Sequence, residues 1–249
     1  MMSVLQKFLL SAGIIMMTFN FTLARVYAES PVQVAINGEG SDVVRVIVVL
    51  TIISLAPFLL LMMTCFARVI IIFSFLRNAL GTQSTPPNQV LVGLALFVTF
   101  FIMQPVLTEV YDVALQPYND GIIQTDEFLD KAAEPIKEFM LNQTTKEDVE
   151  LFKTLSADSE ELEKIEGTKL PMSIVCPAFI TSELKRAFLA GFMIYIPFLI
   201  IDLVVASTLM SLGMIMLPPV SIALPFKIML FVVVDGWGLL IKTLVMTYN

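Results

Sequence analysis

The feature that most constrains the fold is a long apolar run, Ala187 to Leu217, that ends at the double proline Pro218-Pro219. Its only ionisable groups are Asp202 and the weakly acidic Tyr195. As one helix it would measure roughly 46 Å at 1.5 Å per residue, whereas the hydrocarbon of a bilayer is about 30 Å thick. We therefore expect the segment to tilt, to break or to run partly inside protein.

The cheapest places for such a break are Pro197, Gly213 and the double proline, because proline and glycine interrupt helices. Non-helical backbone at membrane depth persists only where protein or a watery cavity covers it. The run therefore favours a channel or a transporter.

Composition indicates a membrane protein, since 57% of the residues are hydrophobic and only 15% are charged. The chain has no histidine, the commonest metal ligand and the usual base for activating a nucleophile. Cys65 and Cys176 cannot form a zinc site by themselves, and we expect two free thiols, with a disulfide as the alternative. No nucleotide-binding loop occurs. We expect no metal, no cofactor and no enzymatic activity.

The N-terminus resembles an export signal. Lys7 precedes an apolar stretch over residues 8–23, and Val26-Tyr27-Ala28 offers a cleavage site. We predict a signal peptide over residues 1–28, cleaved after Ala28, and a polar linker over 29–42. The alternative is a first transmembrane helix that remains attached.

Two helical hairpins are expected, over residues 43–108 and 171–249. In the first, apolar segments at 43–76 and 90–107 flank Gly81 and Pro86-Pro87, and Asn88 could cap the second helix. The first segment is too long for one simple span, so it should bend near Pro57 or after Thr64. In the second hairpin, apolar segments at about 174–217 and 220–246 meet at the double proline.

Between the hairpins, residues 109–170 hold 16 acidic and 6 basic side chains, a net charge of −10 against −7 for the whole chain. Apolar residues recur at helical spacing after Phe128, and Thr145 with Asp148 forms a capping box. We predict two short amphipathic helices in water, whose charge is a solvated surface or a contact with a basic partner. The fold class is all-α, with membrane-associated helical hairpins and an acidic soluble helical insert.

A cleaved signal would leave the mature N-terminus outside, place Arg68 and Arg77 inside, and return the insert to the outside. Lys185 and Arg186 then fall on the wrong side of the membrane. Either the helices are not ordinary spans, or these charges pair with protein, for which Glu183 is an available partner.

Six motifs together resemble one family, the FliP family of flagellar type III secretion export-gate subunits, with its injectisome relatives. The resemblance covers roughly residues 43–107 and 170–240, and the acidic insert and signal-like start favour the flagellar branch. The motifs are FSFLRNALGTQ at 73–83, TPPNQ at 85–89, TSELK at 181–185, IPFLIIDL at 196–203, LPFK at 224–227 and VDGW at 234–237.

The resemblance implies a non-enzymatic gate that assembles as a pentamer with one R-type and several Q-type subunits. Unfolded flagellar proteins would pass through its centre, and we expect no nucleic-acid partner. It places the protein in the bacterial inner membrane and the flagellar basal body, with the insert on the periplasmic side. Helices that look like spans would be largely raised above the membrane, which would explain Lys185 and Arg186.

By the same resemblance, a methionine-rich loop closes the pore. The matching positions are Met214, Ile215 and Met216, with Gly213, Pro218 and Pro219 breaking the helix around them. The family pattern has three methionines, so Ile215 is a departure. Methionine is apolar, unbranched and adaptable, which suits a seal that yields to many polypeptides. Without the resemblance, methionines filling gaps in a core would be the preferred interpretation.

Asp202 and Asp235 lie in apolar surroundings, where a carboxylate costs about 2.5 to 3.5 kcal/mol on insertion scales. Lys227, Lys185 and Arg186 are the expected partners, within one subunit or between subunits. Glu183 and Arg77 are further candidates for assembly contacts. Hydrogen bonding within one subunit is the structural alternative for all of these charges.

Two other functions remain open from the residues alone. An intramembrane aspartyl protease could use Asp202 with Asp235, although the Gly-x-Gly-Asp context expected of such a protease is absent. A proton-coupled transporter could place Asp202 in a broken helix at the membrane midplane. Replacement of Asp202 by asparagine should abolish either activity, whereas in a gate it should act through assembly.

Overall fold

The computed structural model describes residues 61–82, 84–214 and 216–248, together with Ile47, Leu50, Thr51, Ser54 and Phe58. The chain divides into two compact units, residues 1–55 and 56–249. In the first, the Thr51 hydroxyl donates to the Ile47 carbonyl at 2.8 Å, as on one turn of a helix. The expected signal peptide and linker, residues 1–28 and 29–42, lie outside the described residues, and so does Ile215.

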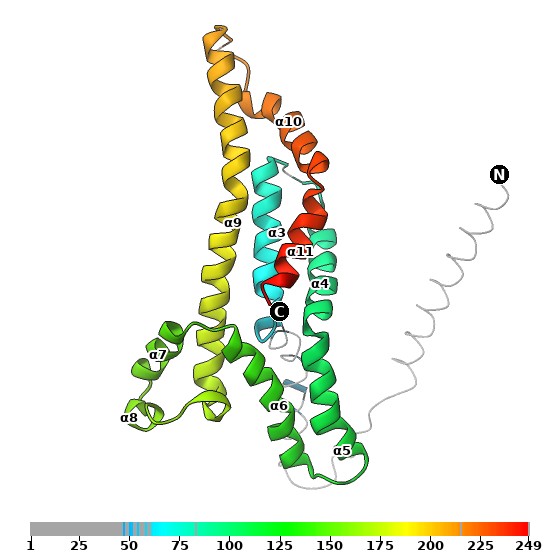
Figure 1. The fold of residues 1–249 in the computed structure, drawn as a ribbon, viewed down its shortest axis with the longest axis vertical. Helices are drawn as coiled ribbons and strands as arrows, with labels where there is room; N and C mark the ends of the chain where they lie inside the picture. The colour runs from blue at the N-terminus through cyan, green and yellow to red at the C-terminus, as the bar shows by residue number, and fades with distance from the viewer. Residues whose placement is uncertain are drawn as a thin grey trace, which may run out of the picture. The chain divides into compact units, whose positions relative to one another are not determined.

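The described part of the second unit is helical and contains no strand, in agreement with the all-α prediction. Figure 1 shows α3, α4, α9 and α11 running along the long axis of the unit, with α10 turning back from the end of α9. By length and composition, residues 88–119 and α9 could each cross a membrane, and α10 with α11 could form a third, bent span. The main helices are α3 (Phe66–Leu80), α4 (Asn88–Val110), α9 (Met172–Ser211), α10 (Pro219–Val233) and α11 (Gly236–Met246).

The first hairpin consists of α3 and α4. Residues 63–65 form a turn before α3, where a bend after Thr64 was expected. Gly81 ends α3 with a φ of 77°, a left-handed conformation that favours glycine, and its N–H donates to the Asn78 carbonyl at 3.0 Å. The capping role expected of Asn88 is wrong, because Asn88 is the first helical residue and Pro87 occupies the cap position.

Helix α9 has 40 residues, about 60 Å at 1.5 Å per residue, so it is longer than a bilayer's hydrocarbon is thick. The expected break at Pro197 is wrong, because the helix passes both Pro177 and Pro197. Close packing of α3 along α9 supports it: a Cβ atom on Gly191 would lie 2.5 Å from Cγ of Phe75. The helix ends at Ser211, and Gly213 follows with a φ of 74°.

The last apolar segment forms two helices rather than one straight helix, and the chain bends by 61° between α10 and α11. Asp235 lies at the bend in the left-handed conformation, with a φ of 50°. Next to it, a Cβ atom on Gly236 would lie 2.2 Å from the Phe231 ring. Trp237 packs edge-on against Phe231 and Phe73, with ring centroids 5.5 and 6.1 Å apart. The VDGW motif therefore fixes a sharp turn against α3.

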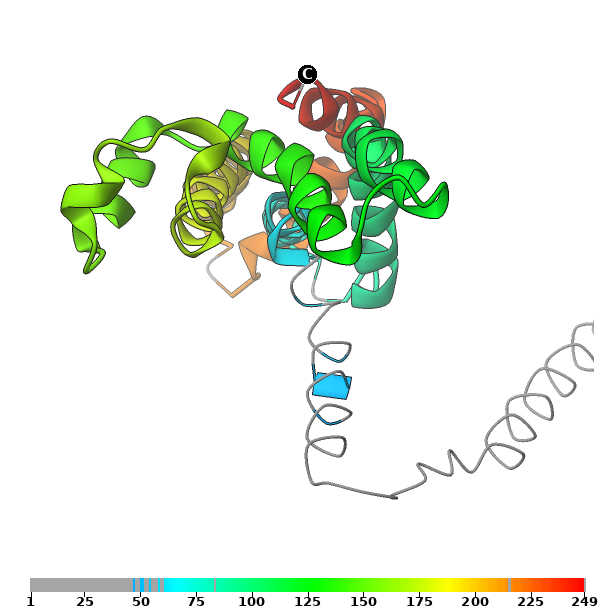
Figure 2. The same ribbon diagram turned by 90° about the horizontal axis from the view of Figure 1, so that it is seen from below.

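The acidic insert begins inside a helix, since α4 continues through the π-helix η1 (Tyr111–Leu115) into α5 (Gln116–Asn119). The two expected amphipathic helices are present, and Thr145 caps the second by accepting from the N–H of Asp148. Met140, Leu162 and Leu170 of the insert pack against the start of α9. Figure 2 shows α6 crossing between α9 and α4 at this end. The remaining elements are α6 (Thr125–Asn142), α7 (Lys146–Leu155), α8 (Ser159–Leu162) and η2 (Gly167–Lys169).

Candidate functional site

The turn between α9 and α10 presents two methionines to the surroundings. Met214 is 47% exposed and Met216 is 98% exposed. The N–H of Met214 donates to the Leu209 carbonyl at 3.0 Å, so this residue is tied to the last turn of α9. Ile215, the third expected gate residue, is not among the described residues. Met216 is thus an apolar side chain at the tip of a hairpin with almost no cover from its own chain.

Apolar exposure continues from the turn down both arms of the hairpin. An exposed apolar surface of this extent is unusual for a monomer in water and marks contact with protein or lipid. The hairpin therefore lacks most of its packing partners when the chain is alone. The exposed side chains here are Leu199, Ile200, Leu203, Val204 and Met210 of α9 and Val220 and Ile222 of α10.

Below the turn, an ion pair joins the two arms. Lys227 of α10 donates to Oδ2 of Asp202 on α9 at 2.6 Å and to the Ala79 carbonyl of α3 at 3.0 Å. Lys227 is 3% exposed, whereas the Asp202 side chain is 32% exposed. Oδ1 of Asp202 is buried without a hydrogen-bond partner in the described part of the chain. Lys227, one of the three partners expected for Asp202, is therefore the residue that pairs with it. The pair joins α9 and α10 to the end of α3.

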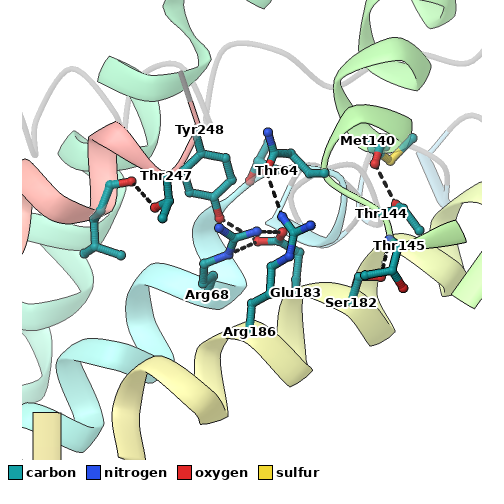
Figure 3. A network of polar contacts seen from close by, with 12 residues as sticks. Thr64, Arg68, Met140, Thr144, Thr145, Ser182, Glu183, Arg186, Thr247 and Tyr248 are labelled. Atoms are coloured by element: carbon teal, nitrogen blue, oxygen red, sulfur yellow. Dashed lines mark hydrogen bonds and ion pairs between the residues drawn. The ribbon is translucent and has the colours of Figure 1, made fainter. Parts of the chain in front are cut away.

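A second buried pair joins α3, α9 and the C-terminal residues (Figure 3). The Arg68 guanidinium makes two hydrogen bonds to the Glu183 carboxylate, with Nε 2.9 Å from Oε2. The Tyr248 hydroxyl donates to the same Oε2 at 2.6 Å, and the guanidinium lies 4.1 Å from the centre of the Tyr248 ring. Arg68 is 3% exposed and Glu183 is fully buried. This cluster holds the end of the chain against the core.

A third cluster anchors the insert on α9. The buried Asp148 carboxylate accepts from Lys185 at 2.5 Å, from Ser182 at 2.6 Å and from Thr145 at 2.8 Å. Burial alone would raise the pKa of Asp148, but the hydrogen bonds from Lys185, Ser182 and Thr145 outweigh it and hold the pKa below its usual value. The carboxylate is therefore ionised at neutral pH and fixes α7 to α9.

The pairing expected between Glu183 and the basic residues that follow it is wrong. Lys185 pairs with Asp148, and Arg186 donates to the Gln143 side chain at 3.1 Å. Residues two apart on a helix do not face each other, so Glu183 and Lys185 point to different neighbours. Both basic residues are therefore accounted for by contacts with the insert.

Two of the expected charged residues, Asp235 and Arg77, lie outside these clusters. Asp235 is exposed at the α10–α11 bend, and among the described residues it takes part in no ion pair. Asp202 is paired with Lys227, and no hydrogen bond joins it to Asp235 in the described part of the chain. Arg77 is half-buried, with no ion pair there either. The described part of the chain therefore does not bring Asp202 and Asp235 together as the carboxylate pair of an aspartyl protease.

Four charged or polar residues of these clusters were not given their roles from the sequence: Arg68, Asp148, Ser182 and Tyr248. Arg68 carried the clearest indication, because it is a charge within a long apolar segment. Asp148 was assigned only a capping role, and nothing in the sequence marks Tyr248. Both cysteines are free thiols, and no group of three potential metal-ligating side chains occurs within the described ranges.

Comparisons with known proteins agree on one family. A model of the FliP family matches residues 49–244. Over 209 residues the chain is 54% identical to the flagellar biosynthetic protein FliP of Bacillus subtilis, covering 84% of this chain and 93% of that protein. It is 49% identical to FliP of Pectobacterium carotovorum, in a match that covers 98% of this chain and 93% of that protein. It is 47% identical to FliP of Aquifex aeolicus, in a match that covers 88% of this chain and 92% of that protein.

Proposed function

The chain belongs to the FliP family, and from that premise we propose that it is a core subunit of the flagellar type III protein export gate. As a family member it is a membrane protein of flagellum biosynthesis and not an enzyme. The proposed site of action is the inner membrane and the basal body, with the acidic insert on the periplasmic side. The proposed cargo is unfolded flagellar protein.

The proposed mechanism is a passive conduit that Met214, Ile215 and Met216 keep closed. The observation that carries it is the exposure of Met216, 98%, at the tip of an apolar hairpin. An uncovered methionine in that place is available to meet its counterparts from other subunits. Its flexible thioether side chain could seal against ions and deform around a passing polypeptide. Energy for export would come from elsewhere in the machine.

The uncovered apolar arms support the proposed assembly into a ring. Copies arranged around one axis would cover the exposed faces of α9 and α10 and bring the methionine turns together. A pentamer with one R-type and several Q-type subunits is the proposed composition, by resemblance to the family. The apolar faces support association in general, whereas the copy number rests on the resemblance alone.

The test is ion leak across the inner membrane of cells that make the complex with Met214→Ala and Met216→Ala combined. We expect an assembled complex that leaks ions, because the smaller side chains leave the constriction open. The matched control is Met229→Ala, which truncates a methionine of α10 that is 59% exposed but remote from the turn. An assembled double variant that stays tight and exports normally would place these methionines in ordinary packing.

A proton carrier is the competing function for Asp202, and the ion pair offers a way to separate the two. Asp202→Asn leaves a buried ammonium without its counter-charge, so a gate should lose assembly. The double change Asp202→Asn with Lys227→Met removes both charges, and a gate should recover part of its assembly and export. A proton carrier would stay inactive with both changes, because its titrating carboxylate is gone.

A further inference from the structure

An apolar groove runs between α9 and α11, with α3 as its floor. Its volume is about 630 Å³, within the range of about 300–1,000 Å³ typical of small-molecule sites. Ile72 and Leu76 form part of the floor, Leu189 and Met193 line one wall, and Leu239 and Leu240 line the other. The groove is thus apolar along most of its length.

One end of the groove carries positive charge. Arg68 and Arg186 line it there, together with Thr243 and Thr247. Arg68 is neutralised by Glu183, whereas Arg186 has an uncharged partner, the Gln143 side chain. Asp148, an insert carboxylate that contacts this part of α9, pairs with Lys185. Among the described residues that line this end of the groove, Arg186 is therefore a guanidinium in no ion pair, and it keeps N–H donors for a ligand.

We propose that this groove holds an acyl chain of an anionic phospholipid, with the head group at Arg186. The apolar walls complement the chain, and the uncompensated guanidinium complements a phosphate. Both walls belong to helices that could cross a membrane, so lipid is at hand when the chain is inserted.

The shape of the groove suits an acyl chain. It extends along α9 from Arg186 to Phe198, about 18 Å at 1.5 Å per residue. A hydrocarbon chain places only apolar atoms along this length, and its charged head group meets Arg186 at one end.

The experiment uses the only tryptophan of the chain, Trp237, as its reporter. Trp237 contacts Phe231, which lines the groove, so bromine atoms on a bound acyl chain should quench its fluorescence. The full-length chain in detergent is titrated with brominated phosphatidylglycerol and, separately, with brominated phosphatidylcholine. We expect saturable quenching that needs about fivefold less of the anionic lipid, the effect of one arginine at a charged lipid surface.

Variants separate the groove from the rest of the lipid-facing surface. Arg186→Gln should remove the preference for phosphatidylglycerol, and Arg186→Lys should restore most of it. Ala190→Phe places a ring in the groove and should weaken quenching by both lipids. Leu203→Phe adds a similar ring to an exposed part of α9 outside the groove and should change neither. Thermal melting of each variant confirms that it is folded.

Two results would overturn the proposal. Equal quenching by the two lipids, unchanged in Arg186→Gln and Ala190→Phe, would mean that Trp237 reports ordinary contact with the micelle. Absence of quenching by phosphatidylglycerol, together with cross-linking of groove residues to a second copy, would mean that protein fills the groove.

Discussion

Glu183 has no exposed surface, and in the described part of the chain its ion-pair partner is Arg68. Glu183→Gln should therefore leave a buried guanidinium without its counter-charge and cost roughly 3–5 kcal/mol of stability. Chemical unfolding of the detergent-solubilised chain measures this loss. Glu147→Gln, on the exposed side of α7, is the control and should be neutral. Equal stability of the two variants would contradict the role of the pair.

Asp148 makes the attachment of the insert dependent on pH. The pKa of Asp148 is lower in the folded chain than in the unfolded chain, where it is about 3.9. The carboxylate therefore stabilises the fold fully when the pH is above about 3.9, and this stabilisation is lost as the pH falls through the pKa of the folded chain. The melting temperature of the wild type should exceed that of Asp148→Asn at pH 7, and the difference should shrink as the pH is lowered below about 4.

The control for this titration is Glu147→Gln, because Glu147 is on the same helix, is exposed and takes part in no ion pair in the described part of the chain. Its melting temperature should follow that of the wild type at every pH. A difference between wild type and Asp148→Asn that stays constant down to pH 2 would show that the charge of Asp148 is not what holds α7 on α9.

At the scale of elements, the contact between α3 and α9 depends on a glycine. A Cβ atom on Gly191 would overlap the Phe75 ring, so Gly191→Ala should cost about 1–3 kcal/mol by overpacking. A Cβ atom on Gly93 of α4 would have no other atom within 4 Å, so Gly93→Ala should be neutral or slightly stabilising. Thermal unfolding of the two single variants compares them directly.

A second-site change tests whether the effect of Gly191→Ala arises at Phe75. Phe75→Leu shortens the side chain that the new methyl group meets, so the double variant should recover part of the lost stability. If the two changes simply add, the helices must already have moved apart, and close packing of α3 on α9 would be excluded as the cause.

At the scale of the whole molecule, α9 separates two regions of opposite character. Its start carries the acidic insert, and its end, about 44 Å beyond Ser182 at 1.5 Å per residue, carries the methionine turn. The insert holds a net charge of −10, whereas the hairpin arms near the turn expose apolar side chains. A chain with this division should be inserted in one orientation.

Cysteine labelling tests that orientation. In a chain whose native cysteines are replaced by alanine, Glu150→Cys places a thiol on the insert and Ser84→Cys places one in the α3–α4 turn, both at exposed positions. A maleimide that cannot cross the inner membrane should label Glu150→Cys in spheroplasts, and Ser84→Cys only after the membrane is opened. The reverse pattern would contradict a periplasmic insert.

Much of the fold could be predicted because its causes are local. Apolar runs and their interruptions indicated where helices lie, and the Thr145 cap and the Gly81 terminus are found where the residue types favour them. The Pro197 break failed because packing along α3 supports α9 past a residue that would end an isolated helix. The bend at Asp235 was missed, since a left-handed aspartate has no distinct sequence pattern.

By itself, the sequence determined that this is an all-helical membrane protein of the FliP family with an acidic stretch between its apolar segments, because hydropathy, charge and motifs are properties of neighbouring residues. Only the tertiary structure decided which charges meet. Lys227 with Asp202, Arg68 with Glu183 and Lys185 with Asp148 each join positions at least 25 residues apart. Such partners are chosen by which helices pack together, and burial then makes each pairing necessary.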